Sequence, residues 1–169
     1  MNKTALLPLL LFAGCLGCGP APATDTSAQD QAAIKSLEDR FSAAFSAKDV
    51  NAIMALYEPG DNLVVFDLVP PRQYTGWAAY KKDWEDTFAA NPGPTEMKLS
   101  ELEISVGGDV AFSHSIQSGF FTDKSGKKMP ITVRVTDGYK KVNGQWLITH
   151  EHVSVPVDLA TAKPDFDSK

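Results

Sequence analysis

The residues best suited to acid–base chemistry lie in one stretch of the chain, residues 134–156. Asp137 has the same strand parity as Val133, Val135 and Tyr139, so a carboxyl group shares a strand face with apolar side chains. Burial on that face would raise the pKa of the Asp137 carboxyl group and suit it to general acid catalysis. A buried structural hydrogen bond explains the same position equally well, so both interpretations stand.

The partner of Asp137 depends on how this stretch folds back on itself. Asn143-Gly144 lies between two strand-like runs and predicts a β-hairpin. A two-residue turn places Asp137 opposite His150, and we favour this register because it collects the apolar side chains on one face. A turn with a glycine bulge instead places Arg134 opposite His152. A shift of one residue moves every side chain to the other face, so the two registers predict different sites.

The histidines are further candidates for chemistry. His114 lies among apolar residues of a strand-like run and is either a core histidine or a base. His150 and His152 are two residues apart, so their imidazoles share a strand face and could bind a metal. No third ligand is evident beside them, and we expect neither a metal nor a cofactor. In the favoured register, Glu151 lies outside the apolar face, beside Arg134.

The segments before the hairpin must position these groups. Apolar residues at helical spacing predict a first helix over residues 28–47. Asp49 is expected to cap a short second helix, and Thr75 a third. Between them, residues 63–67 predict a short buried strand that ends in Asp67, which either caps the following turn or faces the site.

Aromatic residues follow the third helix at spacings of three and four: Trp77, Tyr80, Trp84 and Phe88. Packing of this stripe on a sheet is the favoured interpretation, and stacking on a ligand is the alternative. Trp84, together with Tyr57 at the end of the second helix, is the aromatic candidate for a pocket wall.

Four strand-like runs complete the domain. Residues 96–106 alternate but change parity near Ser100-Glu101, which predicts a β-bulge and a bent sheet. Residues 110–120 form the next run, and the final hairpin supplies the last two. Helices followed by an antiparallel meander are typical of an α+β fold. We therefore expect a cone, in which three N-terminal helices pack on a bent antiparallel sheet around a pocket.

The N-terminal residues predict targeting to the bacterial cell envelope. Residues 1–14 contain Lys3 and an apolar run that is too short to span a bilayer stably. The following Cys15 stands as in a bacterial lipoprotein signal, where the cysteine is lipidated, and Cys18 is a second possible site. We expect a lipid anchor, placing the domain at the periplasmic face of the outer membrane; an ordinary signal peptide would make the protein secreted. The expected divisions are a signal at 1–14, a flexible tether at 15–28, a domain at 29–156 and a polar tail at 157–169.

Charge excludes one class of partner. The formal net charge is −5, and the lysines occur as isolated pairs rather than as a basic block. Nucleic acid binding needs clustered Lys and Arg, so nucleic acid is not an expected partner.

The order of elements and the ending GQWLITHEHVSVP resemble the nuclear transport factor two-like superfamily. Its SnoaL-like proteins and the association domain of calcium/calmodulin-dependent kinase are the nearest branches. The resemblance covers residues 29–156 and rests on the Arg134-x-Thr136 pair, Tyr139, Asn143-Gly144, Trp146 and His152-x-Ser154. It implies the cone fold and a homodimer formed through the sheet. It does not imply one function, because the superfamily includes enzymes, binders and assembly modules.

Ketosteroid isomerase, an enzyme branch of this superfamily, implies roles for two acids. Its general base corresponds to Asp67 and its protonated oxyanion-hole acid to Asp137. Its oxyanion-hole tyrosine corresponds to Phe41, so one donor is missing. Losing such a donor costs on the order of a hundredfold in rate. That specific activity is therefore not expected, although a general proton-transfer pocket remains open.

Three hypotheses follow. The favoured one is a membrane-anchored domain that binds a small, partly apolar ligand; its expected pocket residues are Tyr57, Trp84, His114, Arg134 and His152. The second is an isomerase or lyase that transfers protons with Asp67, Asp137 and His150. The third is an oligomeric assembly domain in which the sheet face is the functional surface.

Overall fold

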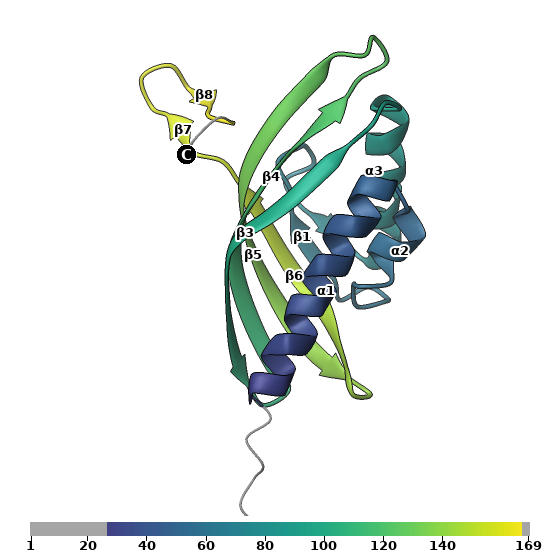
Figure 1. Cartoon of the computed structure of the whole chain (residues 1–169), viewed down its shortest axis with the longest axis vertical. Helices are drawn as coiled ribbons and strands as arrows, with labels where there is room; N and C mark the ends of the chain where they lie inside the picture. Colours follow the sequence, from purple (N-terminus) through teal and green to yellow (C-terminus); the bar gives the residue numbers. More distant parts are fainter. Residues whose placement is uncertain (1–26, 167–169) are drawn as a thin grey trace, which may run out of the picture.

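The computed structural model describes residues 27–166, and the predicted signal and most of the predicted tether lie outside them. Three helices cover one face of a curved sheet: α1 (Ser27–Ala47), α2 (Val50–Met54) and α3 (Trp77–Ala90). The sheet has six strands in the order β2-β1-β6-β5-β4-β3. Their bounds are β1 Val64–Phe66, β2 Tyr74–Thr75, β3 Glu96–Gly107, β4 Val110–Thr122, β5 Lys128–Val142 and β6 Gln145–Ser154. Figure 1 shows α1 lying along the sheet, with α2 and α3 beside it.

This architecture confirms the expected α+β cone. The four long strands form an antiparallel meander, and the short β1 pairs parallel to β6 and antiparallel to β2. The expected polar tail includes a small separate strand pair, β7 (Val157–Asp158) with β8 (Lys163–Pro164).

The helices form where the local sequence predicts them. The predicted face of α1 is buried, including Ile34, Leu37, Phe41 and Phe45. The side chain of Asp49 accepts a hydrogen bond from the Ala52 N–H at 2.9 Å, so it caps α2 as expected. The cap of α3 differs from the prediction, because Gly76 rather than Thr75 occupies that position and no side chain caps the helix.

Two β-bulges shape the sheet, and only one was predicted. The pairing of β3 with β4 shifts between Ser100 and Glu103, and Glu101 has a positive φ of 52°, which confirms the bulge near Ser100-Glu101. A second shift interrupts the pairing of β5 with β6 between Gly138 and Tyr139. Each bulge adds a residue to one strand and changes which side chains share a face beyond it.

The second bulge corrects both predicted registers of the final hairpin. The turn itself is the favoured two-residue type, with Val142 paired to Gln145. Beyond the bulge, however, Asp137 pairs with Glu151 rather than His150. Asp137 and Glu151 are both buried, so the second carboxyl group occupies the place expected for an imidazole.

Strand β4 buries the face that alternates with His114. Its buried side chains are polar: Ser113, Ser115 and Gln117. Its more apolar face points outward, where Phe112 is 54% exposed and Val110 is 59% exposed. Burying polar residues is favourable only when they have partners or line a cavity. Ser113 meets this condition through the Tyr139 hydroxyl, at 2.7 Å.

Candidate functional site

A cavity of about 240 Å³ lies between α1, α3 and the inner face of the sheet. Most of its wall is apolar, including Phe41, Phe45, Trp84, Phe121, Val133 and Val135. Polar groups interrupt the wall at a few positions: Asp67, Tyr80, Asp83, Thr87, Asn91, Gln117 and Glu151. A mainly apolar cavity with few polar groups is the usual form of a small-molecule site.

Asp67 reaches the cavity from the residue that follows β1. Its Oδ1 atom accepts a hydrogen bond from the Leu68 N–H, which holds the carboxyl group at the turn. Its Oδ2 atom lies 3.4 Å from the Tyr80 hydroxyl. Burial raises the pKa of Asp67 above its ordinary value, although the hydrogen bond from Leu68 opposes the shift. Asp67 thus combines both predicted possibilities: it holds the turn and also lines the cavity.

Glu151 is the second carboxyl group in the cavity wall. The hydroxyls of Tyr57 and Tyr80 donate to its Oε2 and Oε1 atoms, each at 2.6 Å. Burial raises the pKa of Glu151 to about 7, and these two hydrogen bonds limit the increase. Because Tyr80 contacts both Glu151 and Asp67, its hydroxyl connects the two carboxyl groups of the wall.

Two further acids lie behind Glu151. Asp137 is directly opposite Glu151 on β5, and Glu38 reaches the same region from α1. The Tyr139 hydroxyl donates to Glu38 Oε1 at 2.8 Å and is itself 2.7 Å from Ser113 Oγ. Burial raises the pKa of Glu38 to about 7. Burial and the neighbouring acids raise the pKa of Asp137 well above its ordinary value.

We refer to Glu38, Asp137 and Glu151 as the carboxyl cluster. Among the described residues, no lysine, arginine or histidine forms an ion pair with any of these three carboxyl groups. Ionising several buried carboxyl groups without counter-charges is costly, so the cluster retains protons near neutral pH. Such groups can donate or accept a proton at the pH at which most enzymes work.

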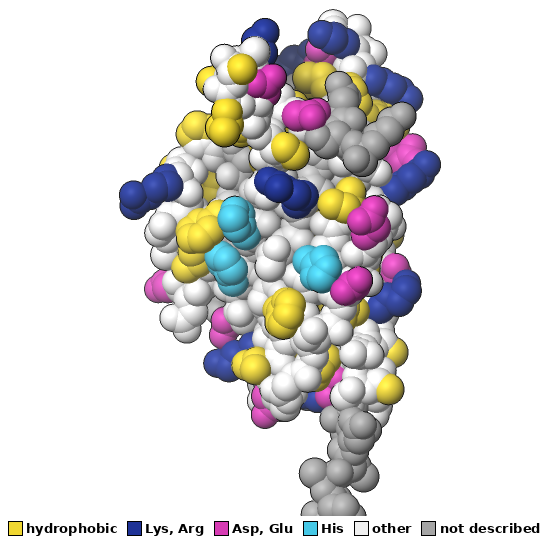
Figure 2. All heavy atoms as spheres, turned by 90° about the vertical axis from the view of Figure 1, so that its left-hand side faces the viewer, with side chains coloured by type: hydrophobic (Ala, Val, Ile, Leu, Met, Phe, Trp, Pro, Cys, Tyr) yellow, Lys and Arg dark blue, Asp and Glu magenta, His cyan; other side chains and the backbone are white. Residues whose placement is uncertain are grey.

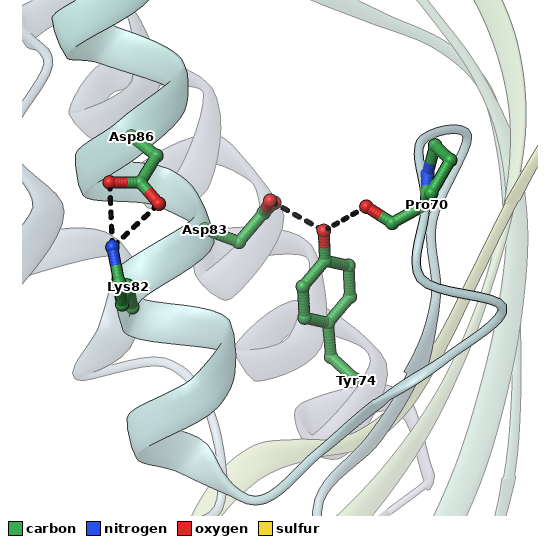
Figure 3. A network of polar contacts seen from close by, with 5 residues as sticks. All are labelled: Pro70, Tyr74, Lys82, Asp83 and Asp86. Carbon is green, nitrogen blue, oxygen red and sulfur yellow. Dashed lines mark hydrogen bonds and ion pairs between the residues drawn. The ribbon is translucent and has the colours of Figure 1, made fainter.

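At one edge of the cavity, contacts join α3 to the loop after β1. Figure 3 shows the Tyr74 hydroxyl between Asp83 on α3 and Pro70 in the loop. It lies 2.6 Å from Asp83 Oδ1 and 3.1 Å from the Pro70 carbonyl oxygen. These contacts fix the loop that carries Asp67, and so position its carboxyl group.

The structure brings four of the predicted site residues together. Asp67 and Trp84 line the cavity. Tyr57 lies behind the wall, joined to it through Glu151, and Asp137 belongs to the carboxyl cluster.

The remaining four predicted site residues lie on the opposite face of the sheet, so their assignment to the pocket is wrong. These are His114, Arg134, His150 and His152. Figure 2 looks onto this outer face and shows all three histidines of the chain on it. The unpredicted bulge in the hairpin moves His150 and His152 outward, and the parity of β4 moves His114 outward.

The outer histidines have ordinary structural contacts. His150 Nδ1 is 2.8 Å from the Val64 carbonyl oxygen. The Phe66 ring packs edge-on against His150 and His152, with centroids 5.1 and 5.6 Å away. His114 Nε2 lies 3.7 Å from Glu103 Oε2. Among residues 27–166, no group of three or more His, Cys, Asp or Glu side chains is arranged to hold a metal ion.

Sequence reasoning missed Glu38 and Glu151. A signal for Glu38 was available, because it lies four residues after Ile34 and three before Phe41, within the apolar face of α1. Glu151 offered no comparable signal, since its face depends on the hairpin bulge.

Comparisons with known proteins agree with this geometry. The family model of the SnoaL-like domain matches residues 34–158. A nuclear transport factor 2-like protein of unknown function from Pseudomonas putida KT2440 is 31% identical, with a TM-score of 0.76, and the match covers 85% of this chain and 98% of that protein. No match was found among curated proteins.

Two more distant structures share the fold. A nuclear transport factor 2-like superfamily protein from Salmonella enterica serovar Typhimurium LT2 is 20% identical, with a TM-score of 0.70 and coverage of 85% of this chain and 100% of that one. A ketosteroid isomerase-like protein from Erwinia carotovora atroseptica SCRI1043 is 20% identical, with a TM-score of 0.64 and coverage of 78% and 97%. At this identity, both similarities concern the fold alone.

Proposed function

Because this chain belongs to the SnoaL-like domain family, we propose that it binds a small, mainly apolar molecule in the cone cavity. The observation that carries this proposal is the cavity itself, an apolar chamber of about 240 Å³ interrupted by a few polar groups. The polar groups that meet the ligand are Asp67 and Glu151, in place of the outer Arg134 and His152.

Retention of a ligand tests this proposal. We expect native mass spectrometry of the protein, purified without denaturation, to show a small molecule bound to the folded chain. Val153→Phe should reduce retention by roughly tenfold or more, because Val153 lines the cavity and the larger ring occupies its volume.

Val110→Phe is the matched control, since Val110 lies on the outer face and is 59% exposed. Equal retention by the two variants would show that any bound molecule lies outside the cone.

A second candidate function, proton-transfer catalysis, is favoured by the Tyr80 hydroxyl. This group lies 2.6 Å from Glu151 and 3.4 Å from Asp67, so it joins two carboxyl groups with raised pKa values at the cavity wall. In this scheme Asp67 removes a proton from carbon next to a carbonyl group, and Glu151 supplies one. The general acid that complements Asp67 is thus Glu151. Asp137, opposite Glu151 on β5, does not line the cavity.

Deuterium exchange tests the second candidate. When the retained ligand is incubated with the protein in D₂O, we expect a C–H position to exchange, as measured by mass spectrometry. Asp67→Asn should slow this exchange by about a hundredfold or more while ligand retention persists, since an amide cannot accept the proton. Asp86→Asn is the control, because Asp86 is an exposed acid of α3. Exchange that continues unchanged in Asp67→Asn would refute the assignment.

We further propose that a lipid on Cys15 anchors the domain at the cell envelope. No helix within the described residues is long and apolar enough to cross a membrane. Both Cys15 and Cys18 lie outside the described residues. The test is the mass of the mature N-terminus from membrane fractions: a diacylated cysteine supports the anchor, and an unmodified N-terminus in the soluble fraction contradicts it.

A homodimer formed through the outer face of the sheet is also part of this proposal. Phe112 is 54% exposed there and Phe66 is 37% exposed, which leaves apolar area for a second copy to cover. Light scattering should give a dimer for the native chain and a monomer for Phe112→Asp. A native monomer would remove this face as a self-association surface.

A further inference from the structure

The charged side chains of the cavity wall are all acidic. Asp67, Asp83 and Glu151 line the cavity, whereas no lysine, arginine or histidine among the described residues does. The acids Asp137 and Glu38 lie immediately behind Glu151 and add negative charge to the same region where they ionise. A ligand that enters this chamber therefore meets several carboxyl groups and no opposing charge.

The nearest lysines of α3 do not supply that charge. Lys82 pairs with Asp86 at 2.7 Å on the outer side of the helix, as Figure 3 shows. Lys81 pairs with Glu85 in the same way. The described lysines of α3 thus face other partners, while Asp83 meets the Tyr74 hydroxyl.

The cavity also has hydrogen-bond acceptors in reserve. The contact of Asp67 Oδ2 with the Tyr80 hydroxyl is long, at 3.4 Å, so this oxygen can accept a stronger donor. Gln117 lines the cavity and is 4% exposed, and its side-chain amide forms no hydrogen bond with other residues in the described part of the chain. This amide offers an acceptor and donors to a polar group on whatever occupies the cavity.

The apolar part of the wall combines aliphatic side chains with a group of packed aromatic rings. Phe45 packs edge-on against Trp84 at 5.8 Å and against Phe121 at 5.2 Å, and Trp84 packs in turn against Tyr80 at 5.8 Å. Aromatic faces attract organic cations as well as hydrocarbon groups, most strongly where water is excluded.

From these features we propose that the ligand is a small organic amine, bound as its ammonium cation. The ammonium group donates to Asp67 and Glu151, which the Tyr80 hydroxyl brings together, and the hydrocarbon part packs on the aromatic wall. This inference rests on the proposed binding function and names the chemical class of its ligand.

A thermodynamic signature follows from this arrangement. A cation in the cavity stabilises the ionised forms of Asp67 and Glu151, so binding near pH 7 releases protons. The other carboxyl groups that share this titration are Asp83 on α3, Glu38 on α1 and Asp137 on β5. Burial raises the pKa of Tyr57, Tyr80 and Tyr139 above its ordinary value, so these neighbouring hydroxyls stay protonated. Binding of a neutral molecule leaves these protons in place.

Calorimetry with three probes of matched size tests the proposal on the native protein. The probes are cyclohexylamine, cyclohexanol and cyclohexanecarboxylate. At pH 8 we expect the amine to bind at least tenfold more tightly than the alcohol, and the carboxylate to bind most weakly. Between pH 8 and pH 5 the amine, which remains a cation, should lose at least tenfold in affinity, while the affinity of the alcohol changes little.

Two variants test whether Glu151 causes the preference for the amine over the alcohol. Glu151→Gln should abolish the preference for the amine while the alcohol still binds, and Asp86→Asn should change neither affinity. If the native protein binds the alcohol as tightly as the amine, the amine inference is overturned and the binding function stands. If none of the probes binds, both proposals are overturned.

Discussion

Replacing Gly119 by alanine should lower the free energy of unfolding by about 3 kcal/mol or more, which is among the largest effects of a single substitution. A Cβ atom at position 119 would lie 1.9 Å from the backbone oxygen of Glu96 and 3.1 Å from the Cα atom of Met97. These are backbone atoms of the paired strand β3, so no side-chain rotation relieves the contact. The strands must separate where they now pair, as a small-to-large change in a packed region requires.

Urea denaturation of Gly119→Ala beside Gly107→Ala measures this effect. A Cβ atom at Gly107 has no neighbour within 4 Å, so that variant should remain close to the native stability. A similar loss of stability in both variants would mean that β3 and β4 pair less closely at Gly119 than the structure indicates. The strain also reaches the site, because Met97, Gln117 and Phe121 around Gly119 line the cavity. We therefore expect Gly119→Ala to lose retained ligand as well as stability.

The features that sequence predicted correctly depend on neighbouring residues only. The apolar face of α1 is set by helical spacing, and the cap at Asp49 by one side chain and its own turn. The first bulge was predicted from a change of parity near Ser100-Glu101. The turn was predicted from the dipeptide Asn143-Gly144, which is common in β-hairpins. Each signal lies within a few residues of the feature that it specifies.

The errors concern which face of a strand points inward. A bulge between Gly138 and Tyr139 reverses the side chains beyond it, and nothing in the local sequence marks it as strongly as the first bulge. The prediction placed His114 of β4 in the pocket, but Ser113, which bonds the Tyr139 hydroxyl, and Gln117, which lines the cavity, lie on the inner face instead. Strand faces are predicted on the rule that apolar side chains point inward, and the burial of polar residues around a site breaks this rule. Asp67 consequently lines the cavity, whereas the histidines lie on the other face of the sheet.

The free energy of unfolding should fall as pH rises from 5 to 8, by about 2 to 3 kcal/mol for each isolated group like Glu38 or Glu151. The pKa of both groups is raised from 4.5 to about 7 in the folded chain, because burial disfavours the ionised form. Below pH 4.5 both the folded and unfolded chains hold these protons, and their contribution to stability is fully present. Between 4.5 and about 7 the unfolded chain has lost protons that the folded chain retains, so stability falls with pH. Above about 7 both states are ionised and the contribution is gone.

Urea denaturation at a series of pH values measures this slope. Glu38→Gln and Glu151→Gln should each flatten it, because glutamine cannot ionise, whereas exposed Asp86→Asn should leave it unchanged. The contributions of the two glutamates will not add fully, since Asp137 lies among them and all three share one field. A stability that rises steadily from pH 5 to 8 would show that the carboxyl cluster is ionised in the folded chain at no cost.

The same slope connects stability with binding. At pH 8 the buried carboxyl groups are ionised, which lowers the free energy of unfolding, and a bound ammonium group would offset this loss. Saturating cyclohexylamine should therefore restore stability at pH 8 more than at pH 5. Cyclohexanol at the same degree of saturation should stabilise the protein equally at both pH values, because it carries no charge. A restoring effect of the amine that survives in Glu151→Gln would place the cation away from this carboxyl group. The carboxyl cluster would then be a feature of the folded core, separate from ligand recognition.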